Sequence, residues 1–255
     1  NFILLINKES EMSLPRIATP KYELTLPSSN KIVHYRPFLV KEEKILLLAL
    51  ESEDETQIMN AVTDIINNCV SEDIDAKNLP MFDLEYIFLQ LRAKSKGEDL
   101  NLEVPCGKCE TPIPFNLNLL NVKVVHTKGH TNKIELTNNI GVIMKYPSIK
   151  LKEGLDTEAS EVENIFSSLT GCLDSIWDKD STYPAKDHTN EELEEFFESL
   201  PEKEFVKIQD FFTTMPVLKH EVDIKCNAKT GKGKEKKTCG WKEKKVLEGL
   251  QSFFA

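Results

Sequence analysis

Two cysteines separated by two residues are the most chemically informative feature of this sequence. Cys106 and Cys109 form a Cys-x-x-Cys pattern, with Pro105 before it and Gly107 inside it. In such a turn the glycine lets the chain bend, so that both thiolates can bind one tetrahedral metal ion. A structural zinc site needs four ligands. The pattern therefore predicts half of a zinc site and requires a second pair of ligands elsewhere in the chain.

The second pair is predicted at Cys226 and Cys239. A glycine follows Cys239, as in the second half of a zinc-binding turn, but twelve residues lie between the two cysteines. This Gly- and Lys-rich stretch is interpreted as a hairpin tip inserted into the turn. The predicted ligands are thus Cys106, Cys109, Cys226 and Cys239, and His220 is the reserve if the Cys226 side chain points away. The alternatives are a former zinc site and a set of small buried thiols.

The two remaining cysteines, Cys69 and Cys172, lie on apolar helical faces and are predicted to be core residues. The sequence shows no secretory signal, which favours a reducing compartment, where paired cysteines act as metal ligands. The Cys-x-x-Cys lacks the strand-to-helix context of a thioredoxin motif. The sequence contains no G-x-S-x-G, P-loop, dinucleotide-binding or HExxH motif. We therefore expect a non-enzymatic protein with no small-molecule substrate.

Composition and charge restrict the possible partners. The chain has 255 residues, with 42 acidic and 32 basic side chains and a net charge of −10. This balance opposes general nucleic-acid binding, because phosphate contacts need a basic face. Charge is uneven: residues 156–203 hold fourteen acidic side chains and three lysines, and residues 225–245 hold nine lysines and two glutamates. Both stretches are interpreted as solvated surface, with an acidic docking face and a lysine-rich contact for an anionic partner as alternatives. No apolar run reaches the roughly 20 residues of a membrane-spanning helix, so no membrane span is expected.

The elements that would position these cysteines begin with a hairpin and a helical cluster. Apolar residues alternate over residues 21–35 and predict a β-hairpin. Apolar spacing predicts helices over residues 40–51 and 55–70. A third helix is predicted to have Asp83 as its N-cap and to end before Gly97.

The middle of the chain combines extended segments with further helices. Residues 112–125 are predicted to be extended, and residues 132–146 to form a hairpin around two asparagines. Capping-box spacing at 160–163 and 189–192 predicts two helix starts. The apolar positions of the first of these helices continue over residues 165–176, which predicts a helix of that length.

Together these signals predict an α+β protein made of helical clusters and short β-hairpins, with a discontinuous zinc-ribbon-like module. A long insertion within the module is tolerated, because the cost of closing a loop rises slowly with its length. The predicted parts are a leader or arm at 1–11, an N-terminal hairpin and helical domain at 12–97, the zinc-ribbon-like module at 98–125 with 218–254, and an inserted hairpin and acidic helical region at 126–217.

Three parts of the chain resemble a known family. They are residues 14–52, which include RPFLVKEEK, residues 79–98, which include FDLEYIFLQLRAKS, and the tail segments within residues 183–254. They resemble the baseplate hub subunits and hub assembly proteins of T-even-like contractile-tailed phages (myoviruses). In the cysteine pattern, Cys106, Cys109 and Cys239 match the family, and Cys226 matches across the lysine-rich insertion.

The resemblance implies a non-enzymatic role in building the central hub of the tail baseplate, as a structural component or an assembly factor. The implied partners are other baseplate and hub proteins, the tape-measure protein among them. The implied location is the virion tail baseplate, the host cytoplasm during assembly, or both. The resemblance also favours zinc as a structural cofactor.

Two questions stay open at the level of sequence. A zinc ribbon that binds nucleic acid, or a regulatory interaction module, is the alternative function. The lysines at 229–237 support it, but they lack the interleaved aromatic residues of single-strand binders. The segment from Arg36 to Lys44 is interpreted either as an interface anchor or as a helix start on which Phe38 packs.

Overall fold

The computed structural model describes residues 17–154, 159–230 and 237–253, and within them the chain is an α+β protein, as predicted. The predicted leader or arm at residues 1–11 lies outside the described residues. None of the described helices is long and apolar enough to cross a membrane. The α-helices are α1 (Val40–Glu51), α2 (Glu55–Cys69), α3 (Met81–Lys96), α4 (Ile149–Glu153), α5 (Glu161–Cys172), α6 (Asn190–Glu198) and α7 (Glu202–Thr214).

All strand pairs are antiparallel. The strands form five small sheets in the described part of the chain. These are β1 (Tyr22–Thr25) with β2 (Ile32–Tyr35); β3 (Asp99–Pro105) with β4 (Pro112–Asn118); β5 (Lys123–Val125), β10 (Val217–Lys225) and β13 (Lys242–Glu248); β6 (Lys133–Glu135), β7 (Gly141–Met144), β8 (Leu173–Trp177) and β9 (Thr182–Pro184); and β11 (Lys229–Thr230) with β12 (Lys237–Thr238). Short 3-10 turns complete the set: η1 (Ala76–Asn78), η2 (Leu119–Asn121), η3 (Ala185–Asp187) and η5 (Leu250–Phe253).

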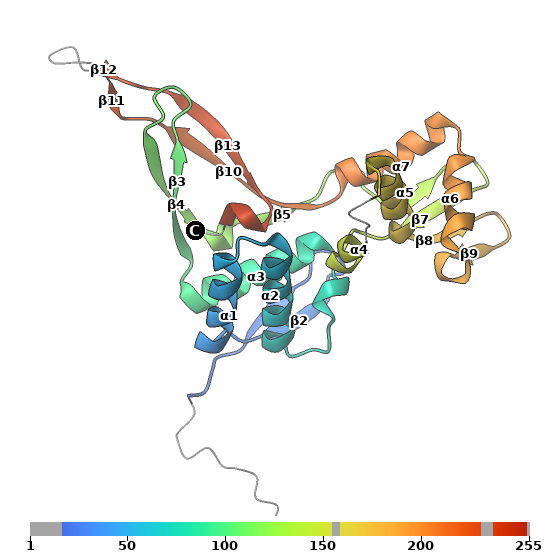
Figure 1. Cartoon of the computed structure of the whole chain (residues 1–255), viewed down its shortest axis with the longest axis horizontal. Coiled ribbons are helices and arrows are strands. Elements are labelled where there is room, and N and C mark those ends of the chain that lie inside the picture. The colour runs from blue at the N-terminus through green and yellow to red at the C-terminus, as the bar shows by residue number, and fades with distance from the viewer. Residues whose placement is uncertain (1–16, 155–158, 231–236, 254–255) are drawn as a thin grey trace, which may run out of the picture.

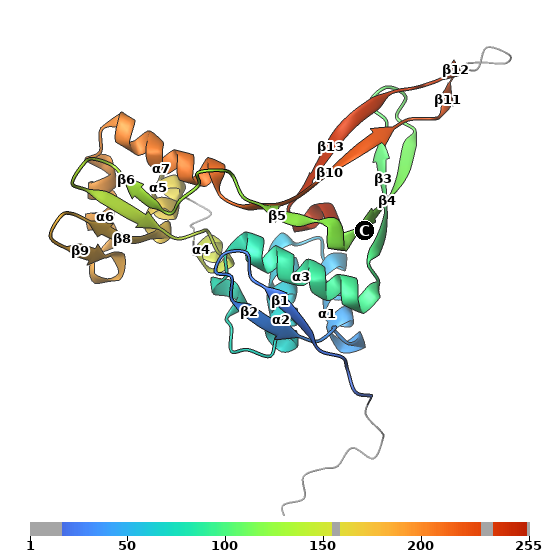
Figure 2. The same ribbon diagram turned by 180° about the vertical axis from the view of Figure 1, so that it is seen from behind.

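The helices α1–α3 and the β1–β2 hairpin lie between two extensions (Figure 1). On one side the β3–β4 and β10–β13 hairpins project together, and on the other side lie the β6–β9 sheet and helices α5–α7; the view from behind shows the same arrangement (Figure 2). The chain leaves for the second extension after β5 and returns at β10, where Val125 pairs with Val217. The two ends of this long insertion are therefore neighbours, which explains how it fits between two paired strands.

Three clusters of buried apolar side chains hold these parts together. The first lies among β1, β2 and helices α1–α3, and includes Ile65, Ile66 and Phe88. The second fills the space between the β6–β9 sheet and helices α5–α7. The third joins α3 to the bases of both long hairpins, through Leu89 and Leu218. Because the third cluster contains residues from α3, β3, β4, β10 and β13, it places both hairpins on the helical cluster.

The N-terminal elements follow the sequence signals, with one correction. The β1–β2 hairpin and α1 and α2 form where they were predicted, and α3 ends at Gly97, whose φ of 110° stops the helix. Asp83, however, is not the N-cap, because α3 starts at Met81 after Pro80. Asp83 is buried instead, and its carboxylate accepts hydrogen bonds from the backbone N–H and the hydroxyl of Ser28. Its side chain therefore ties the hairpin to α3, a long-range role that the spacing of residues along a helix does not reveal.

The segment before α1 is a packed helix start and not an exposed anchor. Phe38 is buried in the first apolar cluster. The carboxylate of Glu42, 1% exposed, accepts hydrogen bonds from the guanidinium of Arg36 at 3.0 Å and from the N–H of Leu39 at 2.7 Å. Burial alone would raise the pKa of Glu42, but these hydrogen bonds outweigh it and hold the pKa below its ordinary value. For residues 36–44 the structure therefore supports the interpretation as a helix start on which Phe38 packs.

In the inserted region both capping boxes form, at Ser160 with Glu163 and at Thr189 with Glu192. The helix that follows the first box is shorter than predicted, because α5 ends at Cys172. The next five residues form strand β8, which pairs with both β7 and β9. The apolar residues before and after Cys172 have the spacing of one continuous helix. Residues 173–177 nevertheless form a strand, because β7 and β9 are available as hydrogen-bonding partners.

Candidate metal centre

The four predicted ligands come from the ends of the two long hairpins. Cys106 and Cys109 lie in the turn between β3 and β4, where Cys106 donates its backbone N–H to the carbonyl of Thr111 and accepts from Glu110. Glu110 adopts a φ of 57°, which reverses the chain after the second cysteine. The fixed backbone of this turn holds both sulfurs on one side of it.

Cys226 and Cys239 lie beyond the paired ends of β10 and β13. The N–H of Cys226 donates to the carbonyl of Trp241 at 2.8 Å, and the N–H of Gly240 donates to the carbonyl of Cys226 at 3.1 Å. The N–H of Cys239 donates to Ala228 at 2.8 Å, just before β11 pairs with β12. The interpretation of the intervening residues as an inserted hairpin is therefore confirmed for the described part, while residues 231–236 lie outside it.

The four sulfurs are close enough to share one ion. Sγ of Cys106 lies 3.8 Å from Sγ of Cys239, and Sγ of Cys109 lies 3.7 Å from Sγ of Cys226. All four sulfurs lie within 4.8 Å of one another. A tetrahedral zinc ion with Zn–S bonds of about 2.3 Å separates its sulfurs by about 3.8 Å. The cluster therefore fits a Cys₄ metal site, and among the described residues it is the group of potential ligands that does so.

The thiols perturb one another strongly. Hydrogen bonds with the side chain and backbone of Thr111 lower the pKa of Cys109 to about 6. A backbone hydrogen bond at Ala228 lowers the pKa of Cys226, but burial and the neighbouring cysteines outweigh it and raise the pKa to about 12. A backbone hydrogen bond at Trp241 lowers the pKa of Cys239, but burial together with Cys109 and Cys106 outweighs it and raises the pKa. Four sulfurs at this distance cannot all ionise without a cation between them, and a divalent ion removes that repulsion.

Lysines are neighbours of the cysteines in the backbone pairing. Lys225 pairs with Lys242 next to the Cys226–Trp241 contact, and Lys229 pairs with Thr238 next to Cys239. A Cys₄ site that held a divalent cation would carry a formal charge of −2, which nearby ammonium groups would stabilise.

Trp241 is a part of the site that the sequence analysis did not identify. A Cβ atom added to Gly107 would lie 2.8 Å from the indole ring, so the ring packs directly on the glycine of the first turn. This contact joins the two hairpins at the level of the sulfurs. Its sequence signal is the tryptophan that directly follows the Cys-Gly pair, but only the tertiary structure shows what it touches.

The other candidate ligands lie elsewhere. His220 lies on β10, where it pairs with Leu247 of β13. It precedes Cys226 by six residues, so along an extended strand the two residues are about 20 Å apart. Cys226 lies with the other three sulfurs, and His220 does not. Cys69 and Cys172 are buried in the first and second apolar clusters, as predicted, and burial raises their pKa values to about 11 and about 12.

Comparison with known proteins identifies the family of the chain. A family model described as T4 bacteriophage base plate protein matches residues 19–255, which include all four cysteines. The chain belongs to this family. The resemblance to phage baseplate proteins noted in the sequence is therefore confirmed.

One relative of the chain comes from phage T4. The chain is 24% identical over 234 residues to a protein of Enterobacteria phage T4 named baseplate hub assembly protein gp26, and the match covers 92% of this chain and 98% of that protein. No solved structure matches the chain. The match thus covers nearly the whole length of both proteins.

Proposed function

We propose that this protein is a non-enzymatic baseplate hub protein of a contractile-tailed phage, which acts in hub assembly through contacts with other proteins. The observation that carries the proposal is the nearly end-to-end match to the baseplate hub assembly protein of phage T4. The partners that we expect are other baseplate and hub proteins, the tape-measure protein among them. The expected location is the host cytoplasm during assembly, and the tail baseplate if the protein stays in the particle.

We further propose that Cys106, Cys109, Cys226 and Cys239 hold a structural zinc ion. The supporting observation is the separation of the sulfurs, 3.7 and 3.8 Å, which matches the edges of a zinc–thiolate tetrahedron. Such an ion supplies folding energy and no chemistry, because all four positions are taken by protein ligands. It would clip residues 98–125 to residues 218–254 and so define the discontinuous zinc-ribbon-like module.

The acidic inserted region is the part that we propose as a contact surface. Its helix α6 places Glu191, Glu195 and Glu198 in solvent, and Thr189 caps its start. The alternative function, a zinc ribbon for nucleic acid, has only the lysines of the hairpin in its favour. The electrostatic demand of a Cys₄ site accounts for those lysines equally well.

A nonsense mutant and quantitative mass spectrometry of particles together test the proposed role. A phage with a nonsense mutation in this gene should fail to form complete baseplates, and the chain supplied in trans should restore them. In purified wild-type particles, a fixed copy number relative to known baseplate proteins identifies a structural component. Absence from particles combined with abundance in infected cells identifies an assembly factor. Normal baseplates formed by the nonsense mutant overturn the proposal.

A further inference from the structure

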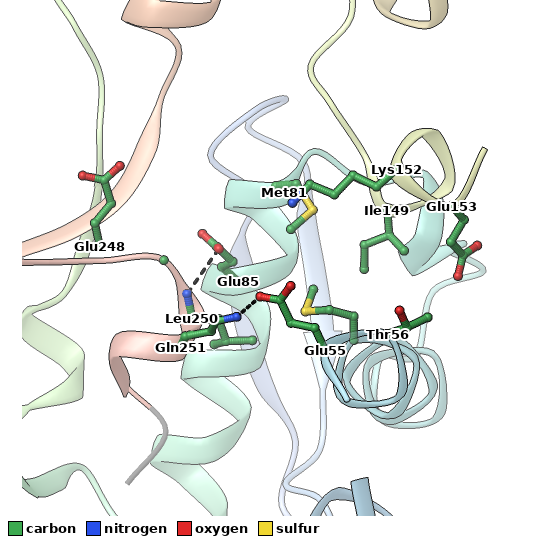
Figure 3. Close-up of a pocket in the computed structure, with 12 residues that line it drawn as sticks. Glu55, Thr56, Met81, Glu85, Ile149, Lys152, Glu153, Glu248, Leu250 and Gln251 are labelled. Carbon is green, nitrogen blue, oxygen red and sulfur yellow. Dashed lines mark hydrogen bonds between the residues drawn. The ribbon is translucent and has the colours of Figure 1, made fainter. Parts of the chain in front are cut away.

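A groove lies where the three parts of the molecule meet. Its larger half is a pocket of about 460 Å³ between α2, α3, α4 and the segment that follows β13 (Figure 3). Its floor is apolar, with side chains from Met59, Met81, Ile149 and Leu250. A flexible, methionine-containing floor suits the stem of a long side chain.

The groove continues past this pocket. A second hollow of about 310 Å³ shares Met81, Glu85, Lys152, Glu248 and Gly249 with the first and extends toward Tyr146 and Met215–Val217. We call the two hollows together the junction groove. It is long and partly open, so it has the shape of a site for an extended segment and not for a compact metabolite.

The charge of the junction groove is unbalanced. Glu85 of α3 and Glu248 at the end of β13 line both hollows, and Figure 3 shows the Glu85 carboxylate turned toward Leu250. Glu85 accepts one hydrogen bond, from the N–H of Leu250 at 3.2 Å. In the part of the chain that the structure describes, neither glutamate belongs to an ion pair. The lining glutamates thus outnumber the one lining lysine, Lys152, and give the groove an excess of negative charge.

The remaining charges of the groove are largely occupied. Glu153 pairs with Lys77 at 2.6 Å, and Glu55 accepts a hydrogen bond from Gln251. Lys152 is the one lining cation of both hollows and forms no ion pair among the described residues. Burial raises the pKa of Glu85 to about 7; the hydrogen bond from Leu250 and the positive charge of Lys152 oppose this rise, and the charge of Glu248 adds a smaller one. A further positive group near Glu85 and Glu248 would favour their ionised forms.

We propose that the junction groove binds an extended segment of a partner baseplate protein, with a lysine or arginine side chain seated at Glu85 and Glu248 and apolar neighbours on either side. The carboxylates complement the ammonium or guanidinium group, and the apolar floor contacts the methylene stem and the flanking residues. A metal ion is the weaker occupant, because only the cysteine cluster groups three or more potential ligands among the described residues. This inference rests on the proposed function for the identity of the partner as a baseplate protein.

Binding of defined peptides tests the proposal. The probes are four pools of pentapeptides whose central residue is lysine, arginine, glutamate or norleucine, with leucine, isoleucine, valine, alanine or proline at the flanking positions. The lysine and arginine pools should bind the full chain at least about tenfold more tightly than the norleucine and glutamate pools, a difference of about 1.4 kcal/mol. Equal binding of all four pools, or no binding of any pool by the folded wild-type protein, overturns the proposal.

Two variants and a control locate the binding site. Glu85→Gln keeps the acceptor for the Leu250 N–H and removes the charge, and Glu248→Gln changes an exposed side chain whose loss leaves folding intact. Each should reduce the preference for the basic pools at least about tenfold. Glu51→Gln, an exposed glutamate at the end of α1 outside the groove, should leave it unchanged. If all three variants bind like the wild type, the groove is not the site.

The same variants separate this inference from the proposed function. In the nonsense phage, chains with Glu51→Gln should restore baseplates, and chains with both Glu85→Gln and Glu248→Gln should not. If the nonsense phage needs the chain but the double variant restores baseplates fully, the groove proposal fails alone. If the nonsense phage builds normal baseplates without the chain, the proposed function fails, and the peptide measurements still decide the chemistry of the groove.

Discussion

Replacement of Cys109 by serine is the sharpest test of the metal centre. Cys109, like Cys239, is half-buried, whereas Cys106 and Cys226 are buried, so the loss of its sulfur disturbs packing less than at either buried position. A serine hydroxyl remains protonated at neutral pH and does not replace a thiolate as a zinc ligand. The variant would leave three thiolates around the ion and open one position to water.

The expected loss of stability follows from linkage. An ion that binds only the folded chain stabilises it by about 4 kcal/mol when its free concentration is 1,000 times the dissociation constant. For a chain of this size, 1 kcal/mol corresponds to about 2–4 °C in Tm, so loss of the ion lowers Tm by about 8–16 °C. The effect should concentrate at the hairpin ends, where Val104 and Ile224 are the buried apolar residues of β3 and β10 next to the cysteines.

Three measurements check this prediction. Elemental analysis should find one zinc per wild-type chain and much less in Cys109→Ser, and calorimetry should show the lower Tm. Hydrogen exchange should accelerate at the N–H of Cys226, which bonds to Trp241 across the hairpin. His220→Ala and Cys69→Ser are the controls, since neither residue contacts the cluster, and both should keep the zinc. Unchanged zinc content and unchanged Tm in Cys109→Ser would refute the reasoning.

Three further substitutions probe other contacts. Gly107→Ala places a methyl group 2.8 Å from the ring of Trp241, so we expect a loss of about 1–3 kcal/mol in urea unfolding with the four cysteines intact; a stability equal to the wild type would mean that the ring moves freely. Glu42→Gln leaves the guanidinium of Arg36 without its anion, and should lower the free energy of unfolding by about 3 kcal/mol at pH 7; a change below 0.5 kcal/mol, roughly that of an exposed pair, would contradict a role for the buried carboxylate. For Glu85, the pKa rises from 4.5 unfolded to about 7 folded, so folding takes up a proton between these values, and the cost of the ionised carboxylate is complete above pH 7 and absent below pH 4.5. Glu85→Gln should therefore gain up to about 3 kcal/mol of stability relative to the wild type as the pH rises from 4.5 to 8, and a difference that does not depend on pH would show that Glu85 is solvated.

Several features of this protein could be predicted from local sequence alone. The capping boxes at Ser160 and Thr189, the end of α3 at Gly97 and the Cys106–Cys109 turn all depend on residues within a few positions of one another. Local hydrogen bonds and φ preferences act over this range, so the pattern is enough to identify them. The hairpin between Cys226 and Cys239 was also predictable, because glycines favour a chain reversal between two segments that must bring their cysteines together.

Tertiary structure decided the features in which distant segments compete or meet. Residues 173–177 have an apolar spacing that suits a helix, but pairing with β7 and β9 makes them a strand. Aspartate is a residue type typical of an N-cap, but Asp83 instead accepts a hydrogen bond from Ser28, which lies 55 residues earlier in the chain. The packing of Trp241 on Gly107 and the groove around Glu85 likewise bring together residues more than a hundred positions apart.

The cysteine cluster shows both kinds of information in one site. Thiolate chemistry and the Cys-x-x-Cys turn are local properties, so the residue types that could bind a metal can be recognised from the sequence. It left open whether Cys226 or His220 is the fourth ligand. That choice depends on which strand end meets the first turn, and the packing of both hairpins on α3 brings Cys226 to 3.7 Å from Cys109. Spacing along a chain specifies chemistry, but only the folded path of the backbone specifies which distant groups share an ion.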